Sequence, residues 1–218
     1  MHGRAGPEVN RTYWASLAAV VAALVFATVA TVASATGGDD KPAAHTPAAA
    51  SADAGFARDM AVHHQQAVEM SFIVRDRTKD EEVRRLAYDI ANTQANQRGM
   101  LLGWLDLWGL PKSEPERLPM AWMGMGSEPG ADGALMPGMA TNTELDELRK
   151  ADGKQAEVRY LTLMTEHHKG GIHMAQGCAQ RCTTEVERSL AQGMVDSQQS
   201  EIDLMAGMLK ARGATPRT

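Results

Sequence analysis

Two segments of this chain, residues 56–109 and 160–213, are copies of one another, and this duplication limits what the chain can fold into. A shift of 104 positions aligns them without a gap, and 13 of the 54 aligned pairs are identical. Four identical pairs form the element Met-x-x-His-His-x5-Met: Met60, His63, His64 and Met70 in the first copy, and Met164, His167, His168 and Met174 in the second. We therefore expect one structural unit to occur twice, with the element at equivalent places.

Each copy has the periodicity of two amphipathic helices. In the first helix, six residues follow one another at spacings of 4, 3, 4, 3 and 4: Phe56, Met60, His63, Ala67, Met70 and Val74. The second copy repeats this spacing, and each copy continues with a second segment of the same kind. Such spacing places the side chains on one face of a helix. No convincing strand pattern occurs between residues 54 and 213, so we predict an all-α fold, an antiparallel four-helix bundle made of two duplicated αα-hairpins.

The ends of these helices carry recognisable signals. Thr78 and Thr184 each precede a glutamate by three residues, which is the form of a capping box at the start of the second helices. Gly109 and Gly213 occupy the places of C-terminal glycine caps. A further short helix is predicted at residues 144–151, with Thr143 as its N-cap.

The N-terminal part of the sequence has the composition of an export segment. Residues 14–33 form an apolar run without a charged residue, and Arg4 and Arg11 precede it. The run is about as long as a bilayer-spanning helix, while Ala33-Ser34-Ala35 fits a signal-peptidase site. Residues 1–35 are thus interpreted as a signal peptide or an N-terminal membrane anchor. Both alternatives place the rest of the chain outside the cytoplasm.

The remaining sequence divides by composition. Residues 36–53 are rich in Ala, Pro and Gly and are predicted to be a flexible linker. Residues 54–213 are predicted to form the duplicated bundle, in three parts: a first hairpin (54–109), a Met/Pro/Gly-rich loop (110–142), and a short helix with the second hairpin (143–213). The net charge is −5 and basic clusters are absent, which argues against a nucleic-acid partner. Contact with a membrane is expected only through the N-terminal segment.

The duplicated methionines and histidines are the first candidates for function. Thioether and imidazole together are suited to copper, whereas zinc favours cysteine and carboxylate. Met60 and His64 lie four residues apart, as do Met164 and His168, so each pair can converge on one ion. If the two copies pack symmetrically, His63 and His167 face each other across the bundle. His173 adds a histidine that the first copy lacks.

A purely structural role for these histidines is the alternative. A histidine on a buried face is often only hydrogen-bonded, here to Gln94, Gln97, Gln198 or Glu201 of the second helices. However, packing does not require the same His-His pair at the same spacing twice. We therefore favour metal binding for the set as a whole.

The loop and the cysteines offer further candidates. Methionines recur through the Pro/Gly-rich loop, and they suit either copper capture or coverage of the bundle: Met120, Met123, Met125, Met136 and Met139. Cys178 and Cys182 are separated by one helical turn, within reach of a disulfide. The oxidising compartment favours that bond, and a thiolate ligand at Cys178 in the reduced form is the alternative.

Signatures of an enzyme are missing from the sequence. The Glu-x-x-His pairs of di-iron bundles do not occur, and neither does a nucleophile–base pair or a phosphate-binding glycine loop. We therefore expect binding without catalysis. A metal-dependent redox enzyme is the most distant alternative, after a structural or interaction bundle without metal.

The repeated Met-x-x-His-His-x5-Met element, the later Gln198-x-x-Glu201, the Met-rich loop and the export segment resemble the family called domain of unknown function 305. The resemblance covers about residues 54–213 and implies a ferritin-like four-helix bundle outside the cytoplasm that binds copper. It also implies a ligand role for the eight residues of the two elements. The chain departs from the family pattern at Gln97, which replaces an acidic residue, in its two cysteines, and in a loop without histidine. We expect copper sequestration or handover to a copper-receiving protein.

Overall fold

A computed structural model describes residues 46–126 and 128–216. The described residues form an all-α fold of five α-helices and two short 3-10 helices, with no β-strand, which confirms the predicted all-α class. Four helices have 26 to 29 residues: α2 (Ala52–Arg77), α3 (Glu81–Leu107), α5 (Gly153–Arg181) and α6 (Glu185–Ala211). Helix α4 (Asn142–Lys150) has nine, and the 3-10 helices are η1 (Ala121–Met123) and η2 (Ala131–Gly133).

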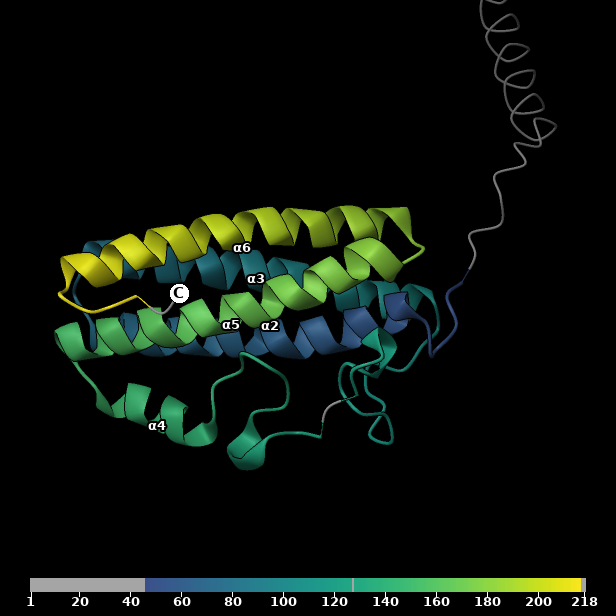
Figure 1. The fold of residues 1–218 in the computed structure, drawn as a ribbon, viewed down its shortest axis with the longest axis horizontal. Helices are drawn as coiled ribbons and strands as arrows, with labels where there is room; N and C mark the ends of the chain where they lie inside the picture. The colour runs from purple at the N-terminus through teal and green to yellow at the C-terminus, as the bar shows by residue number, and fades with distance from the viewer. Residues whose placement is uncertain (1–45, 127, 217–218) are drawn as a thin grey trace, which may run out of the picture. The chain divides into compact units, whose positions relative to one another are not determined.

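The long helices pack in pairs. Helix α2 packs against α3, α5 packs against α6, and α2 also packs against α5 (Figure 1). Near the start of α2, Asp53 accepts hydrogen bonds from Thr183 and Thr184, which follow the end of α5. Further along α2, the Ser71 hydroxyl lies 3.1 Å from the Tyr160 hydroxyl near the start of α5. Helices α2 and α5 are therefore antiparallel.

Helices α3 and α6 end in the same way, as the glycine pattern predicts. Gly109 and Gly213 have φ angles of 65° and 70°. After α3, the Leu110 amide donates to the Leu105 carbonyl oxygen, and after α6 the Ala214 amide donates to the Leu209 carbonyl oxygen. These bonds define a Schellman motif, which needs the left-handed conformation that glycine adopts without steric cost.

The predicted capping boxes of α3 and α6 are wrong. Asp80 is the N-cap of α3, since its carboxylate accepts from the Glu82 and Val83 amides, while Thr78 ends α2. Thr184 is the N-cap of α6, but its side chain accepts no capping bond. Asp53 of α2 accepts from the amide of Thr184 and from that of Thr183 before it. A tertiary contact therefore replaces the half of the capping box in which the Glu187 carboxylate would bind the N-cap amide.

Helix α4 begins two residues before its predicted start. Thr141, rather than Thr143, is the N-cap: its hydroxyl accepts from the Glu144 amide, and the Glu144 carboxylate accepts from the Thr141 amide. The segment before α4 is tied to α2 at two points. Asp59 accepts from the Met120 amide and the Trp122 indole, and Gln66 exchanges two hydrogen bonds with the Ala140 backbone.

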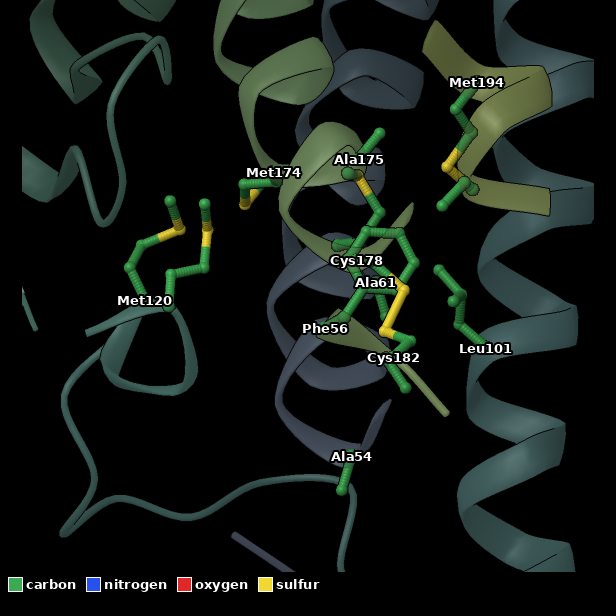
Figure 2. Packing of buried hydrophobic residues seen from close by; sticks show 14 of the residues in the cluster. Ala54, Phe56, Ala61, Leu101, Met120, Met174, Ala175, Cys178, Cys182 and Met194 are labelled. Carbon is green, nitrogen blue, oxygen red and sulfur yellow. A yellow bond between two sulfur atoms is a disulfide. The ribbon is translucent and has the colours of Figure 1, made fainter. Parts of the chain in front are cut away.

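The buried apolar side chains form two clusters. One contains Phe56, Met60, Leu101 and Met174 and is drawn in part in Figure 2; the other contains Met70, Met164 and Tyr160. Along both α2 and α5, the histidine pairs lie in sequence between the residues of one cluster and those of the other. The polar part of the core is therefore a layer in the middle of the helices.

The predicted signal peptide or anchor, residues 1–35, lies outside the described residues, as does the first part of the linker. Helix α2 begins at Ala52, inside the predicted linker and two residues before the predicted bundle. Among the helices that the structure describes, none combines the length and apolarity that crossing a membrane requires.

Candidate metal centre

Four histidines form a layer in the interior, and we call them the histidine layer: His63 and His64 of α2, and His167 and His168 of α5. None of the four side chains is exposed to solvent. The rings of His63 and His167 lie against each other, with centroids 3.7 Å apart. The predicted approach of these two residues across the helix pair is therefore present in the structure.

The hydrogen bonds of the layer fix which ring nitrogen carries the proton. His64 Nε2 lies 2.9 Å from Gln97 Oε1, and His168 Nε2 lies 2.6 Å from Glu201 Oε2. His167 Nε2 lies 3.0 Å from the His63 carbonyl oxygen. Because an oxygen of this kind only accepts, Nε2 is the donor in each ring. In a neutral imidazole, Nδ1 then keeps a lone pair.

These lone pairs have no partner within the protein. The Nδ1 atoms of His64, His167 and His168 are buried without a hydrogen bond, as are both ring nitrogens of His63. An unpartnered buried polar atom costs about 1–3 kcal/mol, and few occur in native proteins. The layer is thus rich in electron-pair donors that the fold does not use.

Two buried glutamines of the second helices have unpaired oxygen atoms. Gln94 of α3 and Gln198 of α6 occupy equivalent positions of the duplicated segments, and the Oε1 atom of each is buried without a partner. Gly171 of α5 makes room for one of them, since a Cβ atom there would lie 2.4 Å from Gln198 Oε1. The second helices therefore add unpaired oxygen atoms.

Burial keeps three of the four histidines neutral. Burial, followed by the neighbouring histidines, lowers the pKa of His63 and His167 well below the usual 6.5. Burial also lowers the pKa of His64 to about 3, against the opposing effect of its bond to Gln97. Metal binding requires the neutral imidazole. These three histidines are therefore in their ligating form throughout the physiological range of pH.

The four methionines of the repeated elements flank the layer on both sides. Met60 and Met174 belong to one apolar cluster, and Met70 and Met164 to the other. Each is at most 1% exposed. The structure thus places a pair of thioethers at each end of the histidine layer, one from α2 and one from α5.

The histidine donors are not gathered around one point. In the described part of the chain, one group of three His, Cys, Asp or Glu residues has its donor atoms within 4.8 Å of one another, and it is Cys178, Cys182 and Glu187. The histidine layer does not meet this distance. For three histidines to bind one ion in this layer, the rings would have to turn. One histidine together with one methionine is a smaller ligand set.

The other predicted ligands lie elsewhere. His173 is exposed, since it precedes Met174 by one residue and points about 100° away from the buried face of α5. Its role as a ligand stays a prediction. Among the loop methionines, Met120, Met123 and Met136 are buried in the first apolar cluster and Met139 packs against it, while Met125 is 44% exposed. The loop therefore covers the bundle.

Cys178 and Cys182 are joined by a disulfide at the end of α5, next to Phe56 and Met174 in the first cluster (Figure 2).

The spacing of Thr184 and Glu187 predicts a capping box, but the Glu187 side chain is completely buried. Burial, and then the Asp53 carboxylate, raises the pKa of Glu187 to about 9. The sequence contains one signal for the burial of Glu187, because its aligned residue in the first copy is the apolar Val83.

A comparison with protein families matches residues 53–209 to the family described as Domain of unknown function (DUF305). The chain belongs to this family. The match covers both copies of the Met-x-x-His-His-x5-Met element, and it confirms the resemblance drawn from the sequence. A comparison with curated proteins finds no match.

Solved structures also resemble the chain. A DUF305 protein from Streptomyces coelicolor, described as secreted, is 68% identical with a TM-score of 0.73, over 78% of this chain and 99% of that one. A DUF305 fragment from Deinococcus radiodurans is 29% identical with a TM-score of 0.60, over 73% and 96%. CopM in the Cu(I)-bound form is 20% identical with a TM-score of 0.56, over 73% and 96%.

Proposed function

We propose that this protein binds copper ions outside the cytoplasm, with the histidine layer and its flanking methionines as ligands, for sequestration or handover without turnover. The observation that carries the proposal is the set of buried imidazoles whose Nδ1 lone pairs have no partner. We further propose that the four long helices form a four-helix bundle that arose by duplication, so that each half contributes one Met-x-x-His-His-x5-Met element.

The chemistry of the donors supports copper. Thioethers are soft ligands that favour Cu(I), and imidazole binds both oxidation states. The bonds from His64 to Gln97 and from His168 to Glu201 are of the kind that orients metal-binding histidines through the nitrogen opposite the metal. CopM, which shares the fold, is known in Cu(I)-bound, Cu(II)-bound and Ag-bound forms.

A structural bundle without metal is the second candidate. The two bonds from histidine to Gln97 and Glu201 fit it equally well. It offers no role for the unpaired nitrogens, each of which destabilises the fold unless a further partner binds. This difference makes the two candidates separable by experiment.

The test is thermal unfolding of the full chain with and without copper. A ligand that binds only the folded state stabilises it by about 2.7 kcal/mol at 100 times its dissociation constant. We expect the wild-type Tm to rise with Cu(I) and with Ag(I). The His63→Ala/His167→Ala variant should lose that rise, and the His173→Ala variant, which changes an exposed histidine, should keep it.

Two outcomes count against the proposal. No copper-dependent rise in Tm of the wild type would leave the histidines with a structural role. An equal rise in the double variant would place the ions elsewhere, since the two rings that meet across α2 and α5 would then be unnecessary.

A further inference from the structure

A second group of potential ligands lies where α5 ends and α6 begins. It consists of Cys178, Cys182 and Glu187, which we call the sulfur corner. One donor atom of each residue lies within 4.8 Å of those of the other two. Cys178 and Glu187 are 0% exposed and Cys182 is 3% exposed. The corner thus has the compactness that the histidine layer lacks.

The duplication shows that packing does not require these side chains. The aligned residues of the first copy are Val74, Thr78 and Val83. Val74 and Val83 are also completely buried, and they pack in the second apolar cluster. The same position in the fold is therefore filled mainly by apolar side chains in one half, and by two sulfurs and a carboxyl group in the other.

The Glu187 carboxyl group is buried beside the Asp53 carboxylate. Both Glu187 oxygens are completely buried, and Asp53 acts on Glu187 through its charge and through a side-chain hydrogen bond. Asp53 also accepts from the Thr183 and Thr184 amides at the start of α6. Burying a carboxyl group is costly, and the aligned residue of the first copy is the apolar Val83.

The two cysteines are suited to act together once the disulfide is opened. The Cys182 amide donates to the Cys178 carbonyl oxygen at 2.8 Å, which holds both residues on the last turn of α5. Their Cα atoms are 4.8 Å apart. The sulfur atoms therefore remain neighbours after reduction, and both stay next to Glu187.

We infer that the sulfur corner is a reduction-gated site for a thiophilic divalent cation of the zinc class, with the thiolates of Cys178 and Cys182 and the carboxylate of Glu187 as ligands. A small dithiol transfers two electrons and two protons to the disulfide, which yields two thiols, and is itself oxidised to a disulfide. The cation then takes the place of the two thiol protons and of the Glu187 proton, which pass to the solvent.

The donor set selects this class of ion. Zinc binds cysteine sulfur and glutamate oxygen together and reaches tetrahedral coordination with three protein ligands and one further ligand. Magnesium and calcium take oxygen ligands only, so two thiolates exclude them. A disulfide sulfur is not a thiolate, and the oxidised corner therefore has no comparable affinity.

The test compares the oxidised and the reduced full chain. The chain is reduced with a dithiol, and the reagent is removed in the absence of air. Cd(II) is then added while the sulfur-to-cadmium charge-transfer absorption is recorded. We expect one Cd(II) per reduced chain, displaced by Zn(II), and no such absorption from the oxidised chain. Circular dichroism is measured in parallel, and loss of helix on reduction would overturn the inference, because the corner needs both helices in place.

Three variants test whether the cation binds at the sulfur corner. Cys178→Ser/Cys182→Ser should abolish the signal. Glu187→Gln should weaken Cd(II) binding on the order of tenfold to a hundredfold, since even an outer-shell partner contributes about that much. Glu185→Gln, which changes an exposed carboxylate two residues away, should not weaken it.

The remaining outcomes are equally decisive. Equal Cd(II) affinity of the Glu187→Gln variant and the wild type would overturn the three-ligand site. The His63→Ala/His167→Ala variant should bind Cd(II) like the wild type when reduced. If it does not, the ion binds in the histidine layer and the inference fails, whatever the result for copper.

Discussion

Replacing Glu187 with glutamine should change how the stability of the oxidised protein depends on pH. Burial, and then the Asp53 carboxylate, raises the pKa of Glu187 from 4.5 to about 9 in the folded protein. In the unfolded chain this carboxyl group is ionised above about pH 5. Between these values the folded state holds one proton that the unfolded state has released.

The direction and the magnitude of the change in stability with pH follow from that proton. The stabilisation is complete below the unfolded pKa and is lost as the pH rises toward the folded pKa, at about 1.4 kcal/mol per pH unit. From pH 6 to pH 8, Glu187 should thus lower the free energy of unfolding by ~3 kcal/mol. Glutamine has nearly the same shape and does not ionise, so the variant should lack this decline.

The assay is urea unfolding of the oxidised chain at several pH values, followed by circular dichroism. The difference in free energy of unfolding between Glu187→Gln and the wild type should grow by ~3 kcal/mol over that range, and the shared histidine contributions cancel in the difference. Glu185→Gln is the control, because it changes an exposed carboxylate two residues away. Parallel curves for wild type and Glu187→Gln would refute the reasoning.

Three further predictions concern the layer and the loop. The His64→Gln variant should lose less stability than the wild type in acid. Burial lowers the pKa of His64 to about 3, so this histidine lowers the free energy of unfolding by about 1.4 kcal/mol per pH unit as the pH falls below 6.5. Urea unfolding measures the difference. Gly171→Ala should destabilise by about 1–3 kcal/mol, because its Cβ atom would meet Gln198, whereas Gly193→Ala, with open space around it, should stabilise by about 0.5–1 kcal/mol. Asp59→Ala removes two hydrogen bonds to the loop and should speed limited proteolysis within residues 110–141.

Each of these has an outcome that contradicts it. If the free energy of unfolding declined equally in acid for His64→Gln and for the wild type, His64 would be charged in the folded protein. Equal stability of the two glycine variants would mean that Gln198 moves aside freely. Proteolysis of Asp59→Ala at the rate of Asp89→Ala, which changes an exposed aspartate, would mean that Asp59 does not hold the loop.

The sequence predicts the helices well because their signals are local. The spacing of Met60, His63, Ala67 and Met70 requires only the geometry of a single helix, and Gly109 needs only its own positive φ angle. Duplication adds a long-range prediction, the approach of His63 to His167, since two equal halves that pack through the same face bring equal residues together.

The errors arise where a distant residue replaces a local partner. Thr184 and Glu187 have the spacing of a capping box, yet Asp53, 131 positions before Thr184, supplies the oxygen and leaves Glu187 inside. The exposure of His173 also depends on more than its place beside Met174, since neighbours on a helix face different directions. Periodicity within one segment does not contain this information.

The difference between Gln97 and Glu201 has a consequence for how the two halves act. The residues are repeat partners, and each holds the histidine of its own half through Nε2. One partner is a neutral amide and the other a carboxylate that is 24% exposed. The layer is therefore nearly symmetric in shape but polarised in charge, with its negative end toward α6. Two cations entering it would meet unequal potentials, so the copies of the repeat would fill in sequence, at different concentrations, rather than as equivalent sites.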